Sequence, residues 1–310
     1  MGKVICPGEL LIDFICSDKT AFLMEGVNFI KMAGGAPANV AVAIKKMGAQ
    51  AYMLGAVGDD QFGHYLEKTL KKYDVNTENL IKTTNANTTL AFVSLDSDGE
   101  RDFKFNRGAD AEYSFDMIDI NVLENANVFH FGSATAFLDG DLRKTYFELL
   151  DYARSNEKWI TFDPNYRDAL FENDKENFIK SSKEFIGSAH IVKVSEEEAR
   201  LITGEKKPEN AALELNFLGA QYVLVTLGSK GALLSTADHQ EFIPVEAVKM
   251  IDSTGAGDAF IGTIVACLAN NDNLSLDTLK EYIVLANKAG AITVQKYGAL
   301  ESIPYLDEII

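Results

Sequence analysis

Short apolar runs alternate with longer amphipathic segments along most of the chain. The apolar runs have the length of buried strands and lie at residues 4–15, 51–57, 127–132, 159–163, 190–194 and 222–227. Helices are predicted where apolar residues recur at helical spacing, at residues 37–48, 62–73, 141–156 and 196–204. This alternating order favours a three-layer α/β/α domain with a central, mainly parallel sheet.

Residues 88–107 break this rhythm, because they read as two strands around an Asp98-Gly99 turn. We expect this hairpin to form a small β-sheet together with residues of about 11–31. That sheet would project from a single α/β domain over residues 1–310 and act as a lid. In such folds the functional residues gather at the carboxyl ends of the strands.

Composition excludes several classes of function. The 310 residues include 46 acidic and 29 basic side chains, for a net charge of −17, and such a surface repels nucleic acid and anionic membranes. Three cysteines without a CxxC pair disfavour a disulfide framework, and four scattered histidines disfavour a metal centre. The sequence shows no signal peptide and no apolar run of membrane length, so we expect a cytoplasmic protein.

The common nucleotide-binding motifs are absent, but a glycine cluster remains. No GxxxxGK[ST] is present and no GxGxxG follows the first strand, which disfavours P-loop NTPases and NAD enzymes. In DSTGAGDAF (252–260), Asp258 follows a run of nearly side-chain-free residues at the start of an apolar helix. Backbone N–H groups at such a start attract anions. An acid at this position would repel a bound phosphate. Asp258 is therefore expected to have a task of its own next to the phosphate.

A second cluster, AGGAPAN, covers residues 33–39. Gly34 and Gly35 precede a helix that begins at Pro37, and Asn39 brings an amide to its first turn. Such a turn, with bare backbone beside an amide, allows close approach of a polyhydroxy ligand.

Together, in this order, the two clusters resemble those of the ribokinase-like (PfkB) carbohydrate kinases. The resemblance runs the whole chain, and within the family it is greatest for fructokinases. Further segments that carry it are GELLIDF (8–14), GDDQFG (58–63), FNRGADA (105–111), FDPNYRDALF (162–171), KVSEEEARLITG (193–204) and VTLGSKGALL (225–234).

The resemblance implies how a phosphoryl group would be transferred. Asp258 is similar to the family's general base, which takes the proton from a sugar hydroxyl as it attacks the γ-phosphate of ATP. The backbone of Gly255, Ala256 and Gly257 is similar to the anion hole that receives the phosphoryl group. Arg167 is placed to meet phosphate charge, and it matters more here because Ala36 replaces a lysine found in many ribokinases.

The resemblance also implies the ligand sites. Sugar would be bound by Asp13, Gly34, Gly35, Asn39, Phe103, Phe105 and Arg107. ATP would be bound by Lys193, Ser195, Thr226, Gly228, Ser229, Gly231 and Asn287. Glu198 would organise Mg²⁺ through water, although Ser195 replaces the asparagine that accompanies it in the family. A K⁺ site would involve Asp252, Thr254, Gly298 and Ser302.

Several readings stay open at the level of sequence. The leading one is an ATP-dependent fructokinase that forms fructose 6-phosphate. A 2-keto-3-deoxygluconate kinase or a ribokinase would use the same fold, although the hairpin offers Phe-Asn-Arg where the former predicts Tyr-Tyr-Arg. A non-catalytic sugar-binding regulator is the alternative from another class. Pairing of two copies through the lid is a further expectation.

Overall fold

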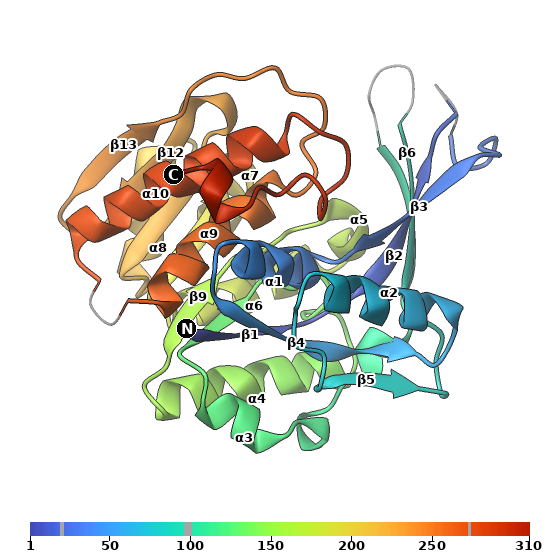
Figure 1. The fold of residues 1–310 in the computed structure, drawn as a ribbon. Coiled ribbons are helices and arrows are strands. Elements are labelled where there is room, and N and C mark those ends of the chain that lie inside the picture. Colours follow the sequence, from blue (N-terminus) through green and yellow to red (C-terminus); the bar gives the residue numbers. More distant parts are fainter. Residues whose placement is uncertain (19–21, 96–100, 272–273) are drawn as a thin grey trace.

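The described residues, 1–18, 22–95, 101–271 and 274–310 of a computed structural model, form two β-sheets (Figure 1). The larger sheet has nine strands in the order β13-β12-β11-β10-β9-β8-β1-β4-β5. Its strands are Lys3–Pro7 (β1), Gln50–Gly58 (β4), Leu80–Thr83 (β5), Val128–Phe131 (β8), Trp159–Phe162 (β9), Ile191–Ser195 (β10), Tyr222–Thr226 (β11), Gly231–Ser235 (β12) and Gln240–Pro244 (β13). Neighbours from β11 to β5 pair in parallel, and only the pairs β11–β12 and β12–β13 are antiparallel. The predicted central, mainly parallel sheet is therefore confirmed.

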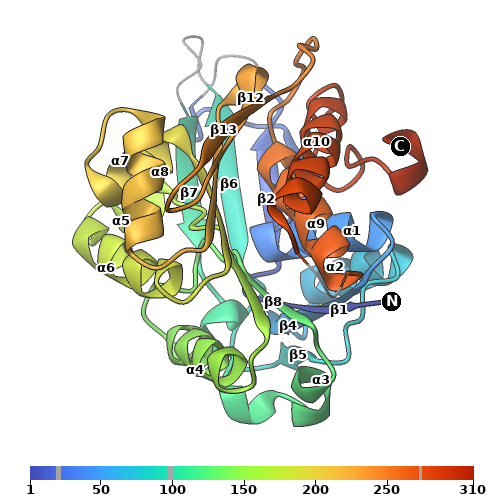
Figure 2. The ribbon, with the colours of Figure 1, turned by 90° about the vertical axis from the view of Figure 1, so that its left-hand side faces the viewer.

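Helices cover both faces of this sheet (Figure 2). One face packs against α1, α2, α9 and α10, and the other packs against α4, α6, α7 and α8. The α-helices are Ala36–Lys46 (α1), Gln61–Lys72 (α2), Ile120–Glu124 (α3), Asp141–Ser155 (α4), Asp168–Phe171 (α5), Lys175–Ile186 (α6), Glu196–Thr203 (α7), Pro208–Phe217 (α8), Ala256–Ala269 (α9) and Leu276–Thr293 (α10). All four helices predicted from periodicity are present, and no end differs from the prediction by more than two residues.

The smaller sheet projects from the helix-covered body (Figure 1). Its order is β3-β2-β6-β7, with strands at Phe29–Gly34 (β3), Leu11–Cys16 (β2), Leu90–Leu95 (β6) and Arg101–Asn106 (β7). The separate sheet built from the two predicted segments is confirmed, although β3 continues three residues beyond the expected limit at 31. The Asp98-Gly99 turn lies outside the described residues.

The prediction of one strand over residues 4–15 is wrong. The chain turns at Gly8, where φ is +140° and a Cβ would lie 2.5 Å from the Ser133 Cβ, so β1 and β2 enter different sheets. Three further strands, β5, β12 and β13, were not predicted. They are only four or five residues long, too short for a clear periodic pattern.

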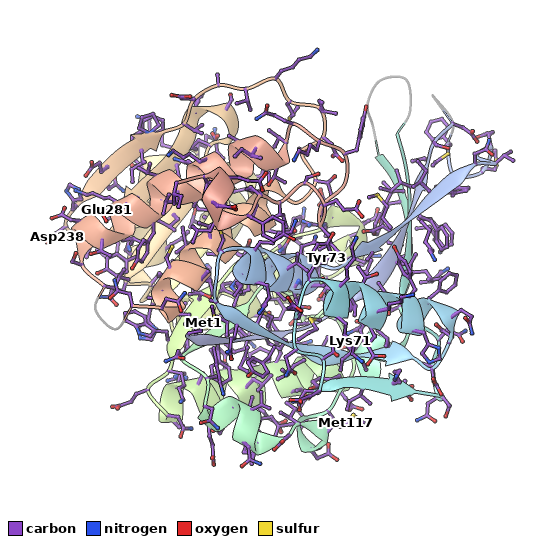
Figure 3. All side chains as sticks on the ribbon, in the orientation of Figure 1. Met1, Lys71, Tyr73, Met117, Asp238 and Glu281 are labelled. Atoms are coloured by element: carbon purple, nitrogen blue, oxygen red, sulfur yellow. The ribbon has the colours of Figure 1, made fainter. Side chains whose placement is uncertain are left out.

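Charged side chains cover the outside of the molecule, as Lys71, Asp238 and Glu281 illustrate in Figure 3. Within the described ranges, no helix combines the length and apolar character that crossing a membrane requires.

A buried polar junction joins the two sheets around Glu9, which lies between β1 and β2 and is 1% exposed. Its carboxylate accepts hydrogen bonds from the Ser133 hydroxyl and, at 3.3 Å each, from the backbone N–H groups of Ala134 and Ala36. Burial raises the pKa of Glu9 to about 7, although the Ser133 hydroxyl opposes the shift. The protonated form of Glu9 is therefore favoured by folding.

This shift predicts a specific pH dependence of stability. A raised folded-state pKa contributes stability that is fully present below the unfolded-state value near 4.5 and is lost as pH rises to about 7. Glu9→Gln cannot titrate at this position and does not lose this contribution. As pH rises over that interval, the free energy of unfolding of the wild type should fall by up to roughly 3 kcal/mol relative to that of Glu9→Gln. Urea denaturation at a series of pH values measures this difference. Glu281→Gln, at an exposed site, is the control. A difference between Glu9→Gln and the wild type that stays constant with pH would contradict the assignment.

Candidate active site

The start of α9 is built to hold an anion. Gly255 caps the helix with φ +80°, and a Cβ there would lie 2.9 Å from Ala299, so only glycine fits. Among the described residues, no side chain caps this helix end. The N–H of Ala256 makes a long hydrogen bond of 3.4 Å to the Ser253 carbonyl. The helix start lies in the positive field of the helix dipole, where its amides can meet an anionic ligand.

Asp258 lies in the first turn of the same helix and is 9% exposed. Its Oδ2 accepts a hydrogen bond of 2.8 Å from the side-chain amide of Asn39, which comes from the start of α1. Burial raises the pKa of Asp258, while Asn39, Lys193 and Arg167 act in the opposite direction. The site thus holds a carboxylate that is more basic than usual, beside a cradle of backbone amides.

A buried ion pair lies under this cradle. Lys193 on β10 donates to Asp163, which follows β9, over 2.8 Å. The Lys193 ammonium is 3.0 Å from the position that a Cβ would occupy at Gly257, so a glycine lets the cation approach the helix start. Burial lowers the pKa of Lys193, but Asp163 and Glu198 outweigh it and raise the pKa overall. Lys193 is therefore positively charged within the site.

Glu198 and Arg167 lie at the same edge of the sheet. Glu198 accepts from the backbone N–H groups of Ser195, at 2.8 Å, and Tyr166, at 2.9 Å, while the Ser195 hydroxyl caps α7. Arg167 donates 2.8 Å to the side chain of Asn165, which holds a left-handed backbone at φ +51°. The turn after β9 thus holds the Arg167 guanidinium and the Glu198 carboxylate near Lys193 and Asp258.

One face of the smaller sheet is directed at this cluster. Asp13 pairs across the sheet with Ala91, and Ala91 pairs with Phe105, so their side chains share a face. Phe103 is on the same face and stacks on Phe105 with centroids 6.1 Å apart. The opposite face packs against α2, where Phe14 contacts Phe62.

Asp13 itself is placed between the sheet and the cluster. Burial raises its pKa to about 6, and the nearby Arg167 guanidinium opposes this shift. A Cβ at Gly34 would lie 1.9 Å from the Asp13 carboxylate, so this glycine is needed for the acid to fit. The structure thus brings Asp13, Gly34, Asn39, Arg167, Lys193 and Asp258 into one cluster, and their roles stay predictions.

Arg107, which was predicted to reach into a sugar pocket, makes hydrogen bonds within the protein. Its Nε donates to Asp110 at 3.1 Å, its Nη2 to the Thr135 carbonyl at 3.1 Å, and its Nη1 to the Asp139 carbonyl. Each nitrogen of the guanidinium therefore bonds a protein acceptor, and the side chain is 16% exposed. A direct contact with sugar stays a prediction that this arrangement does not support.

The predicted nucleotide residues lie on β10, at the end of β11, in the turn that leads into β12 and, for Asn287, on α10. Thr226 ends β11, and at Gly228, with φ +57°, a Cβ would point into open space. Gly231 and Asn287 have structural contacts instead. A Cβ at Gly231 would lie 2.2 Å from the Ile243 carbonyl oxygen, and Asn287 donates to that carbonyl at 3.1 Å.

The predicted cation residues form one loop cluster beside the anion cradle. Asp252 accepts from the hydroxyl and N–H of Thr254, at 2.7 and 2.9 Å, and from the N–H of Gly298 at 3.0 Å. The Ser302 hydroxyl donates to the Gly298 carbonyl. In the part of the chain that the structure describes, no three His, Cys, Asp or Glu side chains are grouped to hold a metal ion. A metal at this site would therefore need backbone, water or phosphate oxygens in addition to side-chain ligands.

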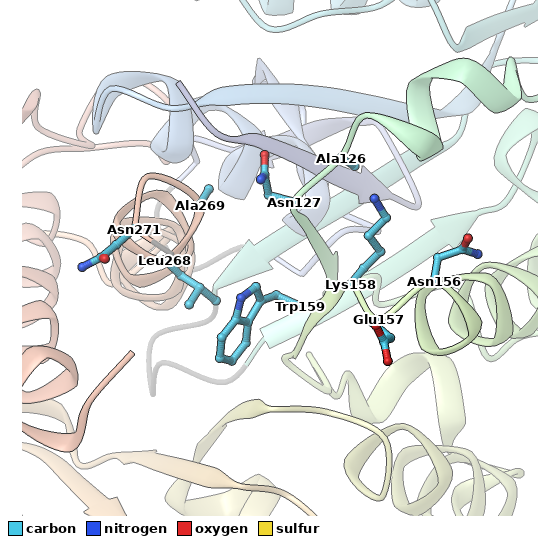
Figure 4. A pocket seen from close by; sticks show the side chains of 9 residues that line it. All are labelled: Ala126, Asn127, Asn156, Glu157, Lys158, Trp159, Leu268, Ala269 and Asn271. Atoms are coloured by element: carbon cyan, nitrogen blue, oxygen red, sulfur yellow. The ribbon is translucent and has the colours of Figure 1, made fainter. Parts of the chain in front are cut away.

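A cavity of about 320 Å³ lies elsewhere in the molecule (Figure 4). Trp159 at the start of β9 and Leu268 near the end of α9 are among its lining residues. At 1.5 Å per helical residue, Leu268 is about 15 Å from Asp258 along α9. The cavity is therefore at the opposite edge of the sheet from the cluster.

Four buried acids and amides of this region were not predicted: Glu9, Asp110, Asp163 and Asn165. Asp163 and Asn165 follow the strand Trp159–Phe162, so their position at a carboxyl strand end could have indicated them. The functions of Glu9 and Asp110 depend on partners far away in the sequence, which no local pattern reveals.

Comparison with known proteins agrees with this geometry. Residues 1–306 match the model of the pfkB family carbohydrate kinases. A probable fructokinase-4 of Arabidopsis thaliana is 37% identical over 99% of this chain and 95% of its own length.

Solved structures are similar over the whole fold. An uncharacterized sugar kinase of Pyrococcus horikoshii, in complex with ATP, has a TM-score of 0.87 and 32% identity, covering 98% of this chain and 96% of that one. A fructokinase of Vibrio cholerae O395, with fructose, ADP and calcium bound, has a TM-score of 0.87 and 28% identity, covering 100% and 99%. The family resemblance seen in the sequence is confirmed, and the chain belongs to the pfkB family of carbohydrate kinases.

Proposed function

We propose that this protein is an ATP-dependent fructokinase that forms fructose 6-phosphate and ADP. One observation carries the proposal: a buried carboxylate, Asp258, lies in the first turn of an uncapped helix start and faces the sugar-side amide of Asn39. Family membership and fructokinase relatives such as the Arabidopsis protein support the reaction and the substrate.

Asp258 acts as the general base. It accepts the proton of a fructose hydroxyl as that oxygen bonds the γ-phosphorus and the bond to the β-phosphate oxygen breaks. Asn39 fixes Oδ2 of the carboxylate, so the acid needs no reorientation during the reaction. Its raised pKa makes it a better proton acceptor than an ordinary aspartate, and positioned bases contribute about 10²–10⁴ in rate.

The positive groups of the site stabilise the transferring phosphoryl group. The amides of residues 255–257 receive its oxygens, and the Lys193 ammonium below them and the Arg167 guanidinium add charge. Glu198 would hold Mg²⁺ through water, and this ion would supply positive charge against the phosphates. A K⁺ ion held near Asp252, Thr254, Gly298 and Ser302 would stiffen the amide cradle.

ATP would bind along the carboxyl ends of β10 and β11. Thr226, Gly228 and Ser229 present backbone at the end of β11, and the open space at Gly228 lets phosphate or ribose approach closely. In this proposal Gly231 and Asn287 shape the site indirectly, by holding β13 against β12 and α10.

Fructose would lie between the main sheet and the lid. Asp13 accepts hydrogen bonds from its hydroxyls, while Gly34 and Gly35 let the sugar reach the backbone. Phe103 and Phe105 form an aromatic surface on the face that carries Asp13, and they would exclude water when the lid closes.

We also propose that two copies pair through their lids. Phe22, Met24, Val27 and Ile30 are 53%, 89%, 81% and 56% exposed along the β2–β3 end of the small sheet. Exposed apolar side chains gathered on one element are typical of an association surface.

Val27→Glu should therefore weaken the dimer, because it places charge in the apolar contact. Sedimentation velocity measures the effect, and Phe217→Glu, at an exposed apolar site on α8, is the matched control. A wild-type protein that sediments as a monomer at tens of micromolar would refute lid pairing.

Asp258→Asn should lower kcat by at least about a hundredfold, because an amide cannot accept the proton. ADP release coupled to a dehydrogenase measures turnover, and binding of an ATP analogue should remain measurable. Asp277→Asn, with a side chain 93% exposed, is the control for charge. Turnover near the wild-type rate would remove Asp258 from the role of base.

The substrate is tested by the same assay over several acceptors, with and without K⁺. Fructose should give a higher kcat/KM than ribose, adenosine, 2-keto-3-deoxygluconate or fructose 6-phosphate. An enzyme that releases ADP with one of these acceptors but not with fructose would overturn the fructokinase assignment and leave the kinase assignment intact.

A further inference from the structure

The guanidinium of Arg107 is held by a buried partner at the base of the lid. Asp110, 1% exposed, accepts from Arg107 Nε at 3.1 Å, from the Thr135 hydroxyl at 2.8 Å and from the Thr89 hydroxyl. Thr89 in turn accepts from the N–H of Gly108 at 2.9 Å. The carboxylate thus neutralises Arg107 and ties it to the loop that follows β8.

This pair is close to the residues that would bind the acceptor sugar. Arg107 follows Asn106, which pairs with Leu90, and Leu90 pairs with Ile12, the neighbour of Asp13. On the other side, the pair connects through Thr135 to the Glu9 junction. The proposed acceptor pocket therefore has the Arg107–Asp110 pair at its side.

Glu9 links the junction to Gly35 and Ala36, next to the residues proposed to bind the sugar. Its carboxylate accepts from the Ala36 N–H at 3.3 Å, and a Cβ at Gly35 would lie 2.5 Å from its carbonyl oxygen. The Thr135 hydroxyl is 3.5 Å from Glu9 and 2.8 Å from Asp110. The two carboxyl groups and one guanidinium are thus linked through Thr135.

We propose that Asp110 is a specificity-determining residue: by neutralising and retaining Arg107, it makes the pocket select uncharged sugars over sugar acids and sugar phosphates. This inference rests on the proposed fructokinase function and identifies what restricts its substrate class. Asp110 does not touch the sugar, and it acts through Arg107.

The physical basis is the charge that an acceptor meets. An anionic acceptor loses hydration on entering the pocket, and an uncompensated cation there would offset that loss. The Arg107–Asp110 pair has no net charge, so it attracts an anion less than an unpaired guanidinium would. Arg167 is likewise close to two acids, because burial raises the pKa of Asp13 and of Asp258 and the charge of Arg167 opposes both shifts. A neutral ketose needs only hydrogen bonds, so it carries no such penalty.

The test compares an anionic and a neutral ligand of the same site. The competitive Ki of 2-keto-3-deoxygluconate is divided by the KM of fructose in wild type and variants. Asp110→Asn frees the charge of Arg107, so this ratio should fall by about tenfold or more. Arg107→Gln leaves Asp110 without its counter-ion, so the ratio should rise several-fold.

Three controls separate charge from packing. Thr89→Val removes a hydrogen bond to Asp110 at constant charge and should leave the ratio within about twofold of the wild type. The double variant Arg107→Gln/Asp110→Asn should return the ratio toward the wild-type value. Circular dichroism and thermal unfolding check that each variant folds.

Ratios of Asp110→Asn and Arg107→Gln that both equal the wild-type ratio would overturn the proposal. If Asp110→Asn does not fold, the rise in Arg107→Gln decides alone, and its absence refutes the inference. A wild-type enzyme without activity on fructose would instead refute the proposed function, so the two failures are distinguishable.

Discussion

The contact between Asn39 and Asp258 brings together two helix starts that are 219 residues apart in the sequence. It forms because α1 and α9 pack side by side at very short range. A Cβ at Gly262 of α9 would lie 2.5 Å from the Ala43 Cβ of α1, so a glycine is required at this crossing. Both helices then present their positive ends at one point. The acid, its orienting amide and the amide cradle all depend on this packing.

Around that point the charges alternate in space. Asp13 faces Arg167, Arg167 also acts on Asp258, and Lys193 is close to both Asp258 and Asp163. Arg167 and Lys193 therefore each interact with two carboxylates. These interactions compensate the cost of burying several charges in one site. In the proposed mechanism the same order separates the two tasks of the site, because the cations would meet the phosphate and Asp13, on the small sheet, would meet the sugar.

The sequence predicted the layers of the fold well, because buried parallel strands and amphipathic helices have different periods. The turn at Gly8 was missed since apolar residues continue on both sides of it. Gly34, Asn39 and Asp258 could be predicted because glycine-rich helix starts have a local physical purpose. The partner of Arg107 could not, because a guanidinium at a strand end fits a ligand and a buried acid equally well. Only the fold shows that Asp110 and two carbonyls meet its three nitrogens.

The most direct test is a crystal structure with fructose and a non-hydrolysable ATP analogue. The account predicts a carboxylate oxygen of residue 258 within about 2.6–3.2 Å of one fructose hydroxyl. It also predicts that the terminal phosphate lies against the amides of residues 255–257. A sugar bound away from this carboxylate, or a phosphate tail that does not reach the start of α9, would contradict it.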